Sequence, residues 1–60
     1  MKVIVEVYKD IDMTYFNTFI IRNVISINYD LRYVSFSIMN KATTFRYATV
    51  FLKSLRLERE

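Results

Sequence analysis

The absence of glycine and proline from all 60 residues restricts the fold of this chain more than any other feature. Glycine normally supplies the left-handed backbone of tight turns, and without it that role falls to Asp and Asn. Small barrels usually need glycine kinks or bulges at their corners in order to close. A curved, open sheet is therefore easier for this sequence to form than a tightly closed barrel.

Apolar and polar residues alternate along several segments with the period of two that is typical of strands. The pattern is clearest at residues 24–29 and 33–39, which the short turn 30–32 joins into a predicted hairpin. The other predicted elements are strands at 2–8 and 43–48 and turns at 9–12 and 40–42. In this hairpin Ile25, Ile27 and Tyr29 are predicted to share one face of the first strand, and Val34, Phe36 and Ile38 of the second strand are predicted to point inward.

Two segments, 13–23 and 48–58, fit both a strand and a helix. The first has aromatic residues at helical spacing after Asp12, a possible N-cap, but it is rich in residues that favour strands. The second combines an apolar i, i+3, i+4 pattern with an alternating end. We predict strands at 13–23 and 53–58 with a bend at 49–52, and a short helix in either segment remains the alternative.

The fold class predicted from these elements is mainly β, in a single domain at residues 1–60. Its strands are expected to form a four- to five-stranded antiparallel meander, which could be a small curved sheet or barrel. Dimerisation is expected to complete the sheet, because unpaired edge strands otherwise promote aggregation.

Hydrophobic residues make up 53% of the chain, more than a domain of this size can hide. Small domains often gain stability from disulfides or metals, but the chain has no cysteine and no histidine. A homodimer is the simplest remaining solution. Adjacent apolar residues should place one side chain in the core and its neighbour on the surface. The predicted dimer or partner interface is Ile20, Ile21, Val24, Val50, Phe51 and Leu52.

Basic and aromatic residues are interleaved along the chain, which carries a formal net charge of +3. Exposed rings and arginines on a sheet can bind a single strand by stacking and by phosphate contact. Alternation places Arg46 and Tyr47 on opposite faces of one strand, which weakens this interpretation. The residues predicted for nucleic-acid or anion contact are Arg22, Tyr33, Arg46, Lys53 and Arg56.

Most catalytic and metal-binding chemistry is disfavoured by the composition. Without histidine and cysteine the commonest general base, thiolate nucleophile and zinc ligands are missing, and without glycine there is no phosphate-binding loop. Asp10 and Asp12 could offer oxygen atoms to a cation, but turn capping is the simpler interpretation. We expect no enzyme activity, no cofactor and no bound metal.

The location and the role are inferred from composition. No apolar run approaches the length of a membrane span, and Glu6 interrupts a segment that begins like a secretory signal, so a cytoplasmic protein without a membrane partner is expected. The abundance of residues with AT-rich codons suggests that the chain is encoded by a phage or mobile element. The predicted function is a small non-catalytic homo-oligomeric protein that binds or inhibits a host protein. The alternatives are a single-strand nucleic-acid-binding or transcriptional accessory protein, and a protein with a small-molecule pocket between protomers.

Overall fold

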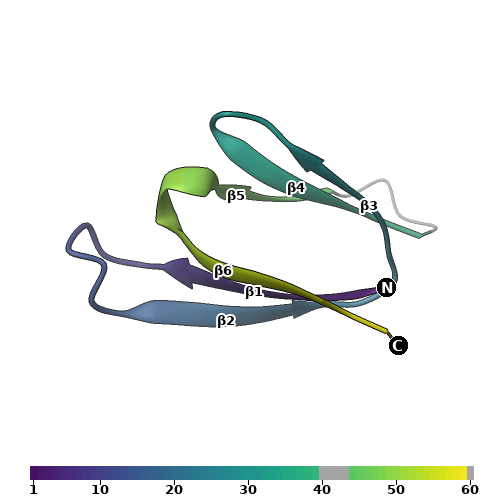
Figure 1. Cartoon of the computed structure of the whole chain (residues 1–60), viewed down its shortest axis with the longest axis horizontal. Helices are drawn as coiled ribbons and strands as arrows, with labels where there is room; N and C mark the ends of the chain where they lie inside the picture. The colour runs from purple at the N-terminus through teal and green to yellow at the C-terminus, as the bar shows by residue number, and fades with distance from the viewer. Residues whose placement is uncertain (40–43, 60) are drawn as a thin grey trace.

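The computed structural model of the chain describes residues 1–39 and 44–59, and these form six β-strands and one short 3-10 helix (Figure 1). The mainly β class is confirmed. In chain order the elements are β1 (Lys2–Tyr8), β2 (Phe16–Ile21), β3 (Val24–Tyr29), β4 (Tyr33–Ile38), β5 (Thr44–Ala48), η1 (Thr49–Phe51) and β6 (Leu52–Glu58).

The strands form two antiparallel sheets of three strands each, a first sheet in the order β2-β1-β6 and a second sheet in the order β3-β4-β5. The prediction of one meander of four or five strands is wrong in this respect, and the sheets do not form a closed barrel. The reason is that the chain bends twice, once between β2 and β3 and once at η1. Each bent segment therefore contributes one strand to each sheet (Figure 1).

The first bend depends on Asn23, whose backbone has the left-handed φ of 61°. Asn adopts this conformation more readily than other residues with a Cβ atom, so it replaces the glycine that the chain lacks. Backbone hydrogen bonds hold the bend: the Val24 N–H donates to the Met1 carbonyl at 2.9 Å, and the Met39 N–H donates to the Asn23 carbonyl at 2.9 Å. The bend is thus anchored to both sheets.

The second bend is the 3-10 helix η1, held against the turn between β3 and β4. The Thr49 N–H donates to the Arg32 carbonyl at 2.8 Å, and the Thr49 hydroxyl donates to the Leu31 carbonyl at 3.0 Å. The predicted bend at 49–52 and the predicted strand at 53–58 are confirmed. The helical alternative is wrong for 13–23, whose central part is β2, and for 48–58 apart from the single turn of η1.

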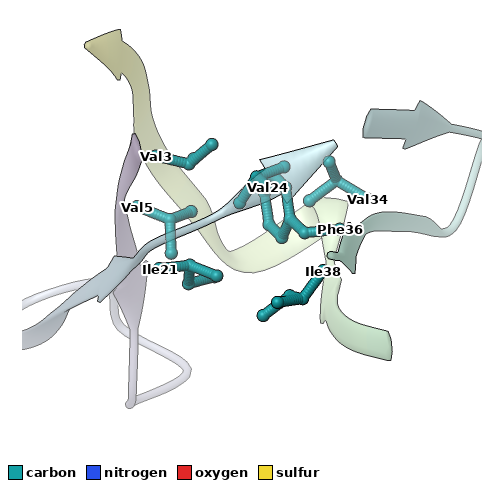
Figure 2. Packing of buried hydrophobic residues seen from close by; sticks show 7 residues of the cluster. All are labelled: Val3, Val5, Ile21, Val24, Val34, Phe36 and Ile38. Atoms are coloured by element: carbon teal, nitrogen blue, oxygen red, sulfur yellow. The ribbon is translucent and has the colours of Figure 1, made fainter. Parts of the chain in front are cut away.

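The core lies between the two sheets and is formed by seven buried apolar residues (Figure 2). The central strands β1 and β4 supply five of them, because a central strand is covered by neighbours on both sides. The prediction that Val34, Phe36 and Ile38 of β4 point inward is confirmed. The core residues are Val3, Val5, Ile21, Val24, Val34, Phe36 and Ile38.

The pairing of β3 with β4 contains a bulge that places Ile25 on the surface. Val24 pairs with Ile38 and the next pair is Ser26 with Ser37, so Ile25 has no partner in the ladder. Its side chain is 58% exposed, and the prediction that Ile25 shares one face with Ile27 is wrong. The extra residue shifts the alternation, so Val24 and Ile27 pack on the core instead. Tyr29, at the end of the strand, is also exposed.

Candidate functional site

An apolar groove of about 390 Å³ opens between β2 and β5, and we name it the β2–β5 groove. It forms because β2 and β5 are outer strands of different sheets and no main-chain ladder joins them. Its lining consists mainly of aromatic and aliphatic side chains, and none of the described lining residues is a carboxylate. The lining residues are Phe19, Ile20, Ile21, Arg22, Asn23, Ile38, Met39, Phe45 and Tyr47.

Three aromatic rings dominate this groove. The rings of Phe19 and Tyr47 stack with centroids 5.3 Å apart, and Tyr47 also contacts the core ring of Phe36 at 6.1 Å. Phe45 is 41% exposed although its strand partner is the fully buried Phe36. The groove is therefore an uncovered continuation of the core, and apolar surface of this kind marks an interaction site.

The groove carries little charge and therefore favours a partner whose contacting surface is uncharged. Burial raises the pKa of the Tyr47 phenol above its ordinary value, so the ring stays neutral through the physiological range. Arg22 is exposed and lines the groove, and no described carboxylate lies within ion-pair distance of its guanidinium. The described residues of this surface therefore offer a partner hydrophobic contact, with the guanidinium of Arg22 beside it.

The residues predicted for the interface do not form one surface. Ile20 is exposed and lines the groove, but Ile21 and Val24 are buried in the core of the chain and leave little surface for a partner. Residues 50–52 belong to η1 and the start of β6, at the end of the molecule opposite the N-terminus and the first bend (Figure 1). The structure therefore separates them from Ile20.

The residues predicted for nucleic-acid contact are divided in the same way. Arg46 and Tyr33 lie together on the outer face of the second sheet, with the guanidinium carbon 5.1 Å from the ring centroid. Lys53 and Arg56 lie on the first sheet, and Arg22 lines the groove. Among these five residues, the direct contact that the structure shows is that of Arg46 with Tyr33.

Three basic residues of the first sheet, Lys2, Lys53 and Arg56, form ion pairs with carboxylates of the same sheet. Lys53 lies 3.7 Å from Glu6, and Glu58 lies 3.3 Å from Lys2 and 3.0 Å from Arg56. A hydrogen bond from the Ser54 hydroxyl lowers the pKa of Glu6, and a hydrogen bond from Lys2 lowers the pKa of Glu58. Both carboxylates therefore remain charged, so Lys2, Lys53 and Arg56 each have a carboxylate partner at ion-pair distance.

The loop after β1 is organised by Asp10, as the turn-capping interpretation predicts. Its carboxylate accepts hydrogen bonds of 2.9 Å from the backbone N–H groups of Thr14 and Tyr15. This geometry helps to hold Met13 at a left-handed φ of 56°. No group of three or more metal-binding side chains occurs within residues 1–39 and 44–59.

Sequence reasoning missed the groove itself. The alternation did place Phe45 and Tyr47 on one face of a strand, but nothing local indicates that this strand lies across from β2. That arrangement depends on the two bends, which bring the edges of different sheets together.

Comparison of the chain with protein-family models, with curated proteins and with solved structures found no match. No helix among the described residues has the length and apolar character needed to cross a bilayer.

Proposed function

We propose that this chain is a small non-catalytic binding protein that acts as a homodimer, with the β2–β5 groove as the dimer interface. The observation that carries the proposal is the groove itself, in which three aromatic rings lie between two outer strands. A second copy that covers the rings would remove their apolar surface from water. It would also shield or pair the outer edges of β2 and β5.

The size of the chain supports a partner of this kind. The chain exposes 4594 Å², whereas about 4,200 Å² is expected for a compact monomer of its mass. The chain thus exposes somewhat more surface than a compact monomer, and Phe19, Ile20 and Phe45 of the groove are among its exposed large hydrophobic residues. A core of seven residues also leaves a 60-residue domain with marginal stability, and association is the remaining way to increase it.

The charge of the groove supports a second copy as the occupant. In a two-fold dimer the same surface of each copy faces its counterpart, so a charged lining would repel itself. Among the described residues that line the groove there is no carboxylate, and Arg22, the one cation among them, is exposed. Two such surfaces can therefore meet through their rings while the arginines stay in water.

The test is the mass in solution, measured by light scattering during size-exclusion chromatography. We expect twice 7.3 kDa for the wild type, unchanged between low and high salt because the contact is apolar. Phe45→Asp should give a folded monomer, since Phe45 lies on an edge strand and outside the buried core. A monomeric wild type would overturn the proposal whatever the variant does.

Two variants serve as controls. Leu31→Asp introduces the same charge at a residue that is 99% exposed and lies outside the groove, and it should leave the dimer intact. Val50→Asp tests the opposite end of the molecule, where Val50 is 66% exposed. Dissociation by Val50→Asp but not by Phe45→Asp would overturn the groove as the interface and move it to η1.

The biological role that we propose is that of a cytoplasmic phage or mobile-element accessory protein that binds or inhibits a host protein. The support is the composition: Ile, Asn, Lys, Tyr and Phe, all with AT-rich codons, make up 25 of 60 residues, and histidine and cysteine are absent. The neighbouring genes test this role. A GC-rich neighbourhood without phage or plasmid genes would contradict it.

A further inference from the structure

The outer face of the second sheet combines hydroxyl groups with an exposed arginine, and its paired rows lack the carboxylates, Glu6 and Glu58, that the first sheet carries beside Arg56. Across β3, β4 and β5 the pairing aligns Asn28 with Ser35 and Arg46 in one row. The neighbouring row is Ser26, Ser37 and Thr44. None of these side chains is a carboxylate, so the face presents hydrogen-bonding groups and positive charge.

A hollow of about 490 Å³ lies at the end of this face, beside the turn between β3 and β4. Its lining contains two guanidinium groups, one aromatic ring and one fully exposed aliphatic side chain. The lining residues are Asp30, Leu31, Arg32, Tyr33 and Arg46. The combination of planar cations with a ring is the one that binds bases and phosphates together.

The cations of the hollow are available, in contrast to those of the first sheet. Within residues 1–39 and 44–59, no carboxylate oxygen lies within ion-pair distance of Arg32 or Arg46. Asp30 is the one carboxylate of the hollow, and it accepts hydrogen bonds of 2.7 Å from the backbone N–H groups of Arg32 and Tyr33. The net charge of these three groups is +1, as on the first sheet, but here neither arginine is held in an ion pair with a described carboxylate.

We propose that this hollow and the adjoining outer face bind single-stranded nucleic acid. Arg32 and Arg46 contact phosphates, and a base stacks against Tyr33, whose ring Arg46 already contacts. A single strand fits better than a duplex, because its bases are free to stack on a ring, whereas a duplex hides them. The site lies outside the β2–β5 groove, so it does not depend on the dimer.

The experiment measures fluorescence anisotropy of a labelled oligothymidylate of about 12 nucleotides, a length that covers one small sheet. At about 50 mM salt we expect saturable binding, with a slope of log affinity against log salt of about −1.4 for two phosphate contacts on a single strand. Arg32→Ala and Arg46→Ala should each weaken binding and each reduce this slope. Tyr33→Ala should weaken binding about tenfold, whereas Tyr33→Phe should retain it because the ring remains.

The matched control is Arg56→Ala, which removes an exposed arginine from the first sheet, where Glu58 already neutralises it. Its affinity should equal that of the wild type. Equal losses for Arg56→Ala and Arg46→Ala would overturn the site, because binding would then follow total charge. Absence of saturable binding at about 200 µM protein would also overturn it. Equal competition by a DNA duplex or by polyglutamate would assign the site to another ligand and reject a single strand.

Discussion

The ring of Tyr47 on β5 stacks on the ring of Phe19 on β2, with 5.3 Å between centroids and 30° between planes, and so connects the outer strands of two different sheets. Replacing Tyr47 by Ala should lower the free energy of unfolding by about 2–3 kcal/mol, since it removes a half-buried ring and an aromatic pair. Urea denaturation measures this loss. Tyr47→Phe keeps the ring and should change stability by less than about 0.5 kcal/mol. Equal losses for both variants would mean that the hydroxyl, and not the stack, stabilises this side.

The same phenol should make the protein sensitive to alkali. Burial raises the pKa of Tyr47 above 10.0 in the folded state, so the unfolded state loses the proton first. The stabilisation is therefore fully present below pH 10 and decreases as the pH rises above it. Urea denaturation between about pH 9 and pH 11 should show this decrease, and Tyr47→Phe should show less of it. An identical alkaline decrease in the variant would contradict the assignment to Tyr47.

The bend between the sheets should depend on the left-handed backbone of Asn23. Asn23→Ala and Asn23→Gly both remove the amide, but only Ala keeps a Cβ atom at the observed φ of 61°. The Ala variant should therefore be less stable than the Gly variant by about 1 kcal/mol, measured by thermal or urea unfolding. Equal stability of the two would show that the bend does not require a left-handed residue.

These bends explain which parts of the fold sequence reasoning could predict. Alternation is a local property, so it correctly located the hairpin of β3 and β4 and the inward residues Val34, Phe36 and Ile38. The division into two sheets depends on Asn23, and one asparagine in a chain with four carries no distinctive signal. The pairing of β6 with β1 joins residues as far apart as Lys2 and Glu58, which no short pattern encodes.

The candidate sites follow the same division. The sequence indicated that adjacent apolar residues such as Ile20 and Ile21 cannot both lie in the core. The structure shows Ile20 exposed beside the buried Ile21. It could not indicate that Phe19 and Tyr47 meet, because their strands belong to different sheets. The contact of Arg46 with Tyr33 likewise required the register of β4 and β5, which is set by pairing and not by composition.

Acid should destabilise the turn between β3 and β4 through Asp30. Hydrogen bonds from the backbone N–H groups of Tyr33 and Arg32 hold the pKa of Asp30 below its ordinary value of 3.8. The stabilisation is fully present above pH 3.8 and is lost as the pH falls through the lower folded pKa. Asp30→Asn retains an acceptor oxygen but cannot titrate, so its stability should fall less between about pH 5 and pH 2. Glu6 and Glu58, whose pKa values are also lowered, should still give the variant some acid sensitivity. Equal slopes for variant and wild type would exclude a contribution from Asp30.

The bulge in β3 predicts opposite outcomes for two isoleucines of the same strand. Ile25 is the extra residue of the bulge and is 58% exposed, whereas Ile27 packs against the core. Ile25→Thr should therefore change the free energy of unfolding by less than about 0.5 kcal/mol, because a β-branched residue remains on the surface. Ile27→Thr should lower it by about 1–2 kcal/mol, since it removes buried methyl groups and introduces a hydroxyl.

Urea denaturation of the two variants decides between the bulge and a regular strand. Regular alternation would place Ile25 and Ile27 on the same inner face, so both variants would lose similar stability. The register change between Val24 and Ser26 breaks that equivalence, because it inserts one residue between two inward positions. A loss for Ile25→Thr as large as that for Ile27→Thr would therefore show that β3 is a continuous strand and that Ile25 belongs to the core.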